Sequence, residues 1–503
     1  APDRTASFFG RALYDYKNRY YATLTVRADG STKFAPGKQW GYFPAGSIAW
    51  RISNEKWMKP IKFISDLKLR ASYGLAGNNR IGNDLWHNIY RVYSGTSAPA
   101  FGNEEYNYYQ FADQTYLYDP DLKWETTITR NIGLDFGFFR NRLSGTVDVY
   151  WNTTKDLLVP SIIPNSSGYS RQMTNVGQTS NKGVEISLDA KIIQTKDFQL
   201  SANFNVAFNK NKVDKLATGE TEWKTKASLS NWYGTYNYKM EVGKSMGLIY
   251  GFVNDGFYKV DDFDFDATTK KWTLKPGIPD NSSFSSGNFA FKPGAMKFKK
   301  LSDSESNLIT EDDMTVIGDT NPKVTGGFGL SGNWKNLDFT AFFNYMCDFD
   351  VLNVNKLYLH SAVRRNYSNL STDMNLANRF RYVDDAGVNV SSDPVALAAL
   401  NENAKTYSWM SVTQGITMTD LVEDGSFLRL STLTVGYTLP KHWLRSLGVK
   451  SLRLYFSGSN LFTITGYSGY DPEVNIQKGL TPGIDNNVTP RSRVYTVGVN
   501  LNF

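Results

Sequence analysis

Hydrophobic and polar residues alternate one by one over several stretches of this chain. In the last stretch, 493–503, one face of an extended chain carries Arg493, Tyr495, Val497, Val499, Leu501 and Phe503. The residues between them are Val494 and small or polar side chains. A period of two predicts a β-strand with one apolar face. Such a face packs on a second sheet in a soluble sandwich and contacts lipid in an outer-membrane barrel.

The same alternation recurs along the chain and predicts thirteen strands. They form hairpins over 7–28, 128–151 and 184–208, single strands from 41 and over 66–76, and closing strands over 324–334, 337–347, 427–439, 450–462 and 493–503. In 66–76, Asp66, Lys68 and Arg70 alternate with apolar residues. Charge at every second position favours a wet lumen over a packed soluble core.

Short turns alternate with long connections. The turns lie at Asn18–Arg19, Arg140–Arg142 and Lys196–Asp197, and the long segments include 77–123, 155–180, 211–245, 253–320 and 349–425. Long loops at one rim and short turns at the other are typical of a transmembrane β-barrel with long extracellular loops. Within or between these elements we predict a short helical turn over 54–60 and helical segments over 373–382 and 393–403.

Composition agrees with an all-β protein and excludes several other classes. Of the residues, 15% are aromatic and 41 are glycine, and there is no apolar run long enough for a transmembrane helix. The single cysteine, Cys347, excludes an internal disulfide and a thiolate zinc cluster. The net charge of +7 comes from interspersed acids and bases, so nothing indicates a nucleic-acid partner.

The start of the chain predicts that it is part of a longer protein. It opens directly in a strand-like segment, Phe8–Tyr16, without a leader sequence. An odd number of strands does not close a single-chain bacterial barrel. We therefore expect residues 1–503 to be the C-terminal part of a barrel whose first strands are absent.

Seven blocks of sequence, in order along the chain, resemble the SusC/RagA-type TonB-dependent outer-membrane transporters. They are Arg27–Phe34, Gly41–Trp50, Leu67–Gly74, Asn175–Gly177 with Asn181–Glu185, Gly318–Pro322, Phe427–Pro440, and Leu452–Phe462 followed by Gly469–Glu473. The resemblance implies a barrel of about 22 strands with a plugged lumen. It further implies a SusD-like lipoprotein lid and energy supplied through TonB, although the N-terminal extension, TonB box and plug have no counterpart in these residues.

Two aromatic-rich loops are the candidate substrate-binding regions. The first carries Trp86, Tyr90, Tyr93, Phe101, Tyr106, Tyr108 and Tyr109, with Tyr116 close by, and the second carries Trp232 and Tyr233. Aromatic faces stack on sugars and contact peptides, and the same residues also suit packing among loops or against a lid protein. A loop of this length is usually functional or disordered, and its aromatic content argues against disorder.

Three further candidate sites depend on weaker patterns. Carboxylates lie at every second residue in Asp262, Asp264 and Asp266, and such oxygen ligands suit calcium. Because the Gly and the distal Glu of an EF-hand loop are absent, the favoured interpretation is an exposed acidic strand end. His87, His360 and His442 lack metal-ligand spacing. Phe503 is a candidate assembly signal, and its alternative role is that of one more aromatic at the membrane interface.

No sequence motif indicates catalysis. There is no nucleophile elbow, P-loop or zinc-protease helix motif. The sequence therefore predicts a non-enzymatic role in the outer membrane of a Gram-negative bacterium, importing an oligosaccharide or an oligopeptide. The alternative is a soluble secreted β-rich adhesin or glycan-binding module whose apolar faces pack against one another.

Overall fold

The computed structural model describes residues 3–503 except for 89, 94–108, 113–115, 170, 218, 228, 230–235, 285–290, 361–368, 410–414, 445–447 and 474–478. None of the helices that these residues form has the length and apolar character needed to cross a membrane.

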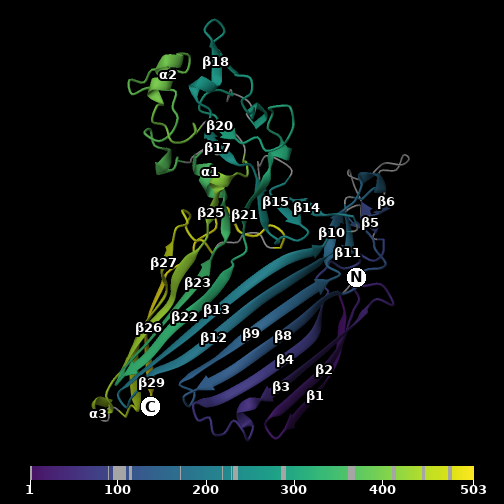
Figure 1. The fold of residues 1–503 in the computed structure, drawn as a ribbon, viewed down its shortest axis with the longest axis vertical. Coiled ribbons are helices and arrows are strands. Elements are labelled where there is room, and N and C mark those ends of the chain that lie inside the picture. Colours follow the sequence, from purple (N-terminus) through teal and green to yellow (C-terminus); the bar gives the residue numbers. More distant parts are fainter. Residues whose placement is uncertain are drawn as a thin grey trace.

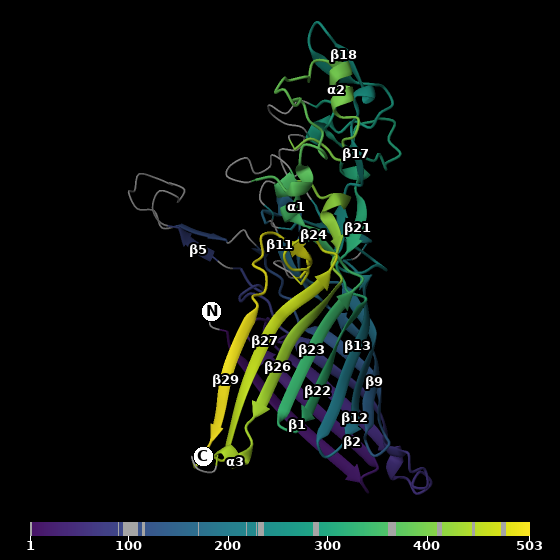
Figure 2. The ribbon, with the colours of Figure 1, turned by 90° about the vertical axis from the view of Figure 1, so that its left-hand side faces the viewer.

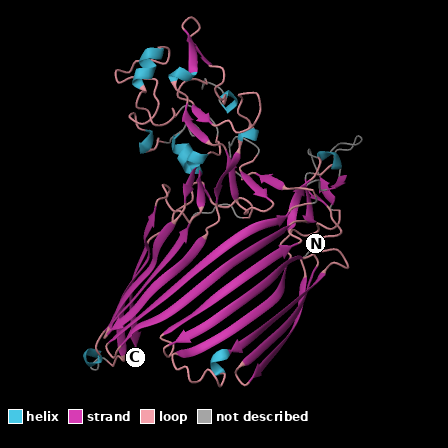
Figure 3. Cartoon of the chain, viewed as in Figure 1, coloured by secondary structure: helices cyan, strands magenta, loops and turns pink. Residues whose placement is uncertain are grey.

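Thirteen long strands form one antiparallel sheet in which each pairs with the next in chain order (Figures 1 and 3). They are β1 Thr5–Tyr16, β2 Tyr20–Ser31, β3 Trp40–Arg51, β4 Ile64–Asn78, β8 Glu125–Phe138, β9 Leu143–Lys155, β12 Gln178–Gln194, β13 Phe198–Lys215, β22 Val324–Trp334, β23 Leu337–Cys347, β26 Phe427–Thr438, β27 Ser451–Thr465 and β29 Val494–Asn502. The thirteen predicted strands are confirmed, and β1 and β29 are the two edges of the sheet.

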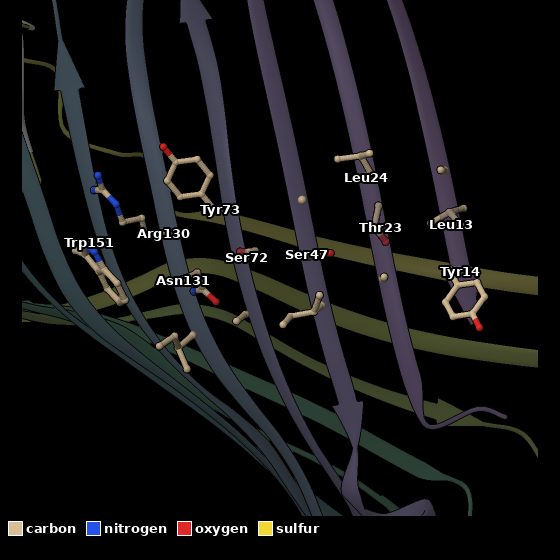
Figure 4. Close-up of a pocket in the computed structure, with 16 residues that line it drawn as sticks. Leu13, Tyr14, Thr23, Leu24, Ser47, Ser72, Tyr73, Arg130, Asn131 and Trp151 are labelled. Atoms are coloured by element: carbon tan, nitrogen blue, oxygen red, sulfur yellow. The ribbon is translucent and has the colours of Figure 1, made fainter. Parts of the chain in front are cut away.

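The sheet has an apolar face that continues from strand to strand. Val184 on β12 pairs with Val149 on β9 and with Phe208 on β13, and Phe208 pairs with Val324 on β22. The sheet curves into a wall (Figure 2), and Figure 4 views its apolar face with later strands of the same sheet behind it. The apolar face is therefore the outer one.

The inner face carries most of the charged side chains of the sheet, and several of them form ion pairs across strands. Arg70 on β4 donates to Asp135 on β8 at 2.9 Å and to Asp148 on β9 at 2.6 Å. Arg51 pairs with Asp66 at 2.8 Å. A further pair, Arg453 Nη2 to Asp338 Oδ2, joins β27 to β23 at 2.5 Å. Lateral pairing of this kind allows a polar wall to form without leaving its charges unpartnered.

The connections differ in length at the two ends of the sheet. At one end lie the short connections 17–19, 52–63, 139–142, 195–197, 335–336 and 439–450. At the other end lie 32–39, 79–124, 156–177, 216–323, 348–426 and 466–493. The predicted asymmetry between long loops and short turns agrees with this arrangement (Figure 1).

The long loops contain short strands and helices. The strands are β5 Tyr90–Tyr93, β6 Tyr109–Ala112, β7 Tyr116–Leu117, β10 Leu158–Ile162, β11 Arg171–Asn175, β14 Glu222–Thr225, β15 Tyr238–Glu241, β16 Leu248–Gly251, β17 Asn254–Phe257, β18 Phe263–Asp266, β19 Lys271–Leu274, β20 Met296–Phe298, β21 Thr315–Asp319, β24 Asp350–Asn353, β25 Val422–Asp424 and β28 Ile484–Asp485. The helices are α1 Val354–His360 and α2 Pro394–Leu400, and α3 Lys441–Leu444 lies at the opposite end of the sheet (Figure 1).

The helix predictions have mixed outcomes. The helix predicted over 393–403 is confirmed as α2, because Pro394 occupies its first turn and Asp393 Oδ1 accepts from Val395 N at 3.0 Å. The helix predicted over 373–382 is wrong, since that stretch begins with a 3-10 turn, Thr372–Met374, and then becomes irregular. The helical turn predicted over 54–60 is displaced, since a 3-10 turn, Ile52–Asn54, ends where the prediction begins and non-helical turns follow it.

Candidate functional site

Three long loops fold together into one body above the sheet. Segments 216–323, 348–426 and 466–493 contribute to a single hydrophobic core that includes Tyr238, Phe252, Phe298, Leu352, Leu357, Met418 and Ile484. Figures 1 and 2 show this loop body standing at the upper end of the sheet, over the later strands. A body with its own core can hold a surface in a fixed position at the mouth of the sheet.

A buried arginine attaches the third loop to the sheet. Arg429 on the inner face of β26 is 2% exposed. Its Nη2 lies 2.5 Å from Asp471 Oδ1, and its Nη1 lies 2.9 Å from Glu473 Oε2. Arg491 reaches the other oxygen of Glu473 at 2.6 Å. This Arg429 clamp joins two of the sequence blocks noted above and fixes the start and the end of loop 466–493.

A second attachment lies in the block Gly318–Pro322, at the end of β21. The backbone N–H of Asp319 donates to Asp350 Oδ2 at 2.7 Å. The side chain of Asn321 accepts from Asn211 Nδ2 at 2.6 Å, which connects this loop to the end of β13. Burial raises the pKa of Asp350. The block therefore acts as a joint where the first and second loops meet the strands.

A carboxylate on β25 connects the second loop to the third. Glu423 accepts hydrogen bonds from the backbone N–H and the hydroxyl of Ser468, at 2.9 Å and 2.8 Å. Lys356 on α1 lies 3.2 Å from the same carboxylate. Burial alone would raise the pKa of Glu423, but these hydrogen bonds and the lysine hold it below its ordinary value.

A smaller loop cluster stands over the early strands. Phe34 and Leu122 are fully buried there, and Trp124 packs against Phe34 with its indole N–H donating to Gln39 O at 2.9 Å. Asn175, which belongs to one of the sequence blocks, accepts from Lys123 N at 2.8 Å and donates to Asp156 O at 2.9 Å. These contacts give a packing role to Tyr116, which lies against the same cluster.

The predicted aromatic substrate residues are only partly placed. Trp86 is half-buried, stacks on His87 with ring centres 4.4 Å apart, and has a buried Nε1 with no partner among the described residues. Tyr90, Tyr93 and Tyr109 belong to the β5–β6 hairpin, whose side chains are not described. Outside the described residues lie Phe101, Tyr106, Tyr108, Trp232 and Tyr233. Substrate contact by these residues stays a prediction.

The predicted calcium residues each have a separate partner. Asp262 lies 3.4 Å from Lys297, Asp264 lies 4.0 Å from Lys275, and Asp266 caps the turn at Thr268 and Thr269. In the part of the chain that is described, no three His, Cys, Asp or Glu side chains gather as a metal site would require. Calcium binding by this acidic strand also stays a prediction.

The remaining predicted residues lie apart from one another. His360 on α1 is 2.8 Å from Asp373, and burial lowers the pKa of this imidazole below its ordinary value. Phe503 follows the last residue of β29 and is 74% exposed. None of these residues belongs to the Arg429 clamp. The sequence analysis did not predict this clamp, although two of its blocks contain Arg429 and its carboxylate partners.

Comparison with known proteins places this architecture in a family. Residues 2–461 match the family model described as TonB dependent receptor-like, beta-barrel. The chain belongs to this family.

Relatives of this barrel family match nearly all of the chain. TonB-dependent receptor P3 of Formosa agariphila is 32% identical over 503 residues, covering 99% of this chain and 45% of the relative. TonB-dependent receptor SusC of Bacteroides thetaiotaomicron is 31% identical over 509 residues, covering 99% and 43%. The predicted resemblance is confirmed, and the chain spans about half the length of the relatives it matches.

The solved structure of the RagAB peptide transporter has the same fold. It matches with a TM-score of 0.74 and 27% identity, over 99% of this chain and 48% of that chain. The match therefore extends over both the sheet and the loops of this chain.

Proposed function

We propose that residues 1–503 form the C-terminal part of the barrel of an outer-membrane importer. In this proposal the remainder of the protein supplies the plug and the TonB box, and a SusD-like surface lipoprotein covers the mouth. The cargo is an oligomeric nutrient, either an oligosaccharide or an oligopeptide. The chain binds and conducts this cargo and does not transform it chemically.

The observation that carries the proposal is the two-faced sheet. Thirteen strands present a continuous apolar surface outward and cross-strand ion pairs inward. A soluble adhesin would need a second layer over the apolar face, yet Ile48, Leu24 and Val497 on that face are more than half exposed. Lipid covers such a face without a second protein layer, whereas exposed apolar surface of this extent is unfavourable in water.

The two edges of the sheet support closure by further strands. In hydrocarbon, an unpaired backbone group costs several kcal/mol, so β1 and β29 need partners within the membrane. We propose that strands preceding residue 1 pair with both edges and complete a barrel of about 22 strands. Such a barrel is wide enough to contain a plug domain.

The loop body suits capture of cargo and docking of the lid. The three loops share one hydrophobic core, the Glu423 contacts join the second loop to the third, and the Arg429 clamp fixes the third loop to the sheet. A fixed surface loses less conformational entropy when it binds a partner or a cargo. The RagAB relative is a peptide transporter, which supports a peptide cargo, and the aromatic loops suit a glycan equally well.

The import cycle follows from these parts. Cargo binds at the external face under the lid, TonB moves the plug, and the cargo passes along the polar inner wall. The ion pairs on that wall, such as Arg453 with both carboxylate oxygens of Asp338, are already satisfied across strands and so bind passing cargo only weakly.

Purification of the full-length protein from its own outer membrane tests the proposal. We expect extraction to require detergent, a surface lipoprotein to co-purify, and mass spectrometry of the bound material to identify an oligosaccharide or an oligopeptide. Recovery of the protein in aqueous buffer without detergent would contradict the proposal and support the soluble adhesin.

A further inference from the structure

The outer face carries an unusual row of cations near its loop end. Lys182 on β12 faces outward, because it alternates with Val184 on the apolar face. Its cross-strand partners are Trp151 on β9 and Lys210 on β13. Both lysines are exposed, and neither has a carboxylate within salt-bridge distance among the described residues.

Arg130 on β8 lies on the same outer face, on the strand that pairs with β9, which carries Trp151. Its Nη1 donates to Thr153 Oγ1 on β9 at 3.3 Å, and its guanidinium carbon lies 5.9 Å from the ring centre of Tyr73 on β4. Figure 4 shows Tyr73, Arg130 and Trp151 grouped on one face. Arg130 likewise lacks a carboxylate partner within the described part of the chain. We call Arg130, Lys182 and Lys210 the cationic row.

Direct opposition of two lysines is unfavourable unless a negative charge lies between them. Like charges on directly opposed residues destabilise a sheet, and Lys182 and Lys210 are such a pair. The adjoining hollow of about 1200 Å³ is lined by both lysines, Trp151 and Phe208. Its two carboxylates have partners already, since Glu241 pairs with Lys239 and Asp319 accepts from Asn321. An external anion would relieve the repulsion.

An apolar groove begins directly beside Arg130 and Trp151. It has a volume of about 770 Å³, and both residues line it together with Ile132 and Tyr73. Its other lining residues include the small residues Ala12, Ala22, Gly46 and Ala71 on adjacent strands. A Cβ added at Gly46 would meet only a backbone oxygen at 3.6 Å, so the space above Gly46 is open. Figure 4 shows residues that line the groove, from Trp151 and Arg130 across to Leu24 on β2 and Tyr14 on β1.

We propose that the cationic row and this groove together bind a membrane lipid whose headgroup carries phosphate. The phosphate contacts Arg130, Lys182 and Lys210, and the acyl chains lie over the small side chains of the groove. The inference rests on the proposed function, which places this face in the outer membrane with the loop end outside.

The chemistry favours a lipid over the other anions. Arginine and lysine bind phosphate strongly, and aromatic side chains such as Tyr73 and Trp151 suit the boundary between headgroups and hydrocarbon. A free phosphate ion would use the cations and leave the groove empty. A lipid occupies both parts of the site, because its phosphate contacts the cations and its acyl chains fill the groove.

Native mass spectrometry of the detergent-solubilised full-length protein tests the proposal. The probes are dioctanoyl phosphatidic acid, dioctanoylglycerol without phosphate, and inorganic phosphate as competitor. We expect selective binding of phosphatidic acid, and we expect R130Q/K182Q/K210Q to weaken it by about tenfold or more. The matched control K56Q/K59Q/K62Q removes three exposed lysines from the connection between β3 and β4 and should bind as wild type does.

A second variant separates the groove from the charges. Ala71→Phe leaves the cationic row intact and fills the floor of the groove, so it should also weaken phosphatidic acid binding. Unchanged binding by the triple variant would overturn the proposal, as would equal competition by inorganic phosphate. Extraction of the protein without detergent would instead overturn the proposed function, so the two failures are distinguishable.

Discussion

At the scale of the residue, Arg429 is the side chain whose loss should have the largest effect on the loops. Arg429→Gln would leave the buried carboxylate of Asp471 without its cation and Glu473 with only the exposed Arg491. Breaking a buried pair from one side costs roughly 3–5 kcal/mol. We expect faster proteolysis of loop 466–493 and a lower unfolding temperature of the full-length protein.

The matched control is Arg491→Gln, because Arg491 is 51% exposed and pairs with the same Glu473. An exposed pair contributes roughly 0–1 kcal/mol, so this variant should resemble wild type in both measurements. Equal effects of the two variants would show that Arg429 does not anchor the loop.

Asp313 predicts a pH dependence in the loop body. Its buried carboxylate accepts from the backbone N–H groups of Ser302 and Thr310 and pairs with Lys300 at 3.1 Å. Burial would raise the pKa of Asp313, but these contacts lower it from 3.8 to about 2. A pKa lowered by folding stabilises the protein above pH 3.8, by about 2 kcal/mol, and this contribution disappears as the pH falls toward 2.

Asp313→Asn isolates this contribution. We expect the variant to be less stable than wild type at pH 6 and the difference to shrink as the pH falls from 4 to 2. Hydrogen exchange of the loop body at several pH values would measure it. A difference that stays constant with pH would rule out ionisation of Asp313 as its cause.

Leu188 on β12 tests which face of the sheet meets lipid. Its partners are Gly145 and Phe204 on the apolar face, whereas the next residue, Asp189, lies on the inner face. Leu188→Lys should destabilise the protein in a bilayer by roughly 2–4 kcal/mol, and Asp189→Lys much less. Reversible urea unfolding from lipid vesicles gives both values. A larger cost at Asp189 would mean that the faces are reversed.

At the scale of the element, β29 combines an edge of the sheet with the last aromatic residue. Val497 and Val499 pair outward with Phe456 and Leu454 on β27, and Phe503 follows the strand. Deletion of Phe503 should trap the full-length protein in the periplasm if this residue is an assembly signal. Cell fractionation measures the outcome, with Asn502→Gln as control. Normal insertion with a slightly lower unfolding temperature would leave Phe503 only an interfacial role.

The long strands could be predicted from the sequence because their signal is local. Each side chain of a two-faced strand reports its own environment, so alternation predicts all thirteen, with ends that differ by at most seven residues. The strands extend beyond the apolar stretch at the loop end, as β12 does from Gln178 and β13 to Lys215. There the alternation fades because both faces are polar.

The loops could be predicted much less well. The helix α1 was missed, although Val354, Leu357 and Tyr358 are its buried residues, because seven residues give a short periodic signal. The predicted helix over 373–382 is absent because Asn375 bonds its own backbone neighbours, Thr372 O and Ala377 N, instead of continuing a helix. The Arg429 clamp joins residues 42 positions apart, and no local pattern reveals such a contact.

At the scale of the whole molecule, the chain combines a membrane wall with a folded body at one end. The strands of the sheet place alternate side chains toward lipid and toward the aqueous lumen, whereas the loop body is stabilised by a buried hydrophobic core. The Arg429 clamp and the block Gly318–Pro322 connect the two parts. This arrangement holds the loops as a fixed surface, while the position of the strands is determined by their contact with the membrane.

A cysteine scan along β12 in the full-length protein tests the central claim most directly, namely that the apolar face meets lipid and the polar face meets the lumen. Single cysteines would replace residues 184–189 in a background with Cys347→Ser. Labels at Val184, Ile186 and Leu188 should be quenched by lipid-phase quenchers, and those at Glu185, Ser187 and Asp189 by aqueous ones. The reverse pattern, or equal aqueous quenching at all six positions, would contradict the account.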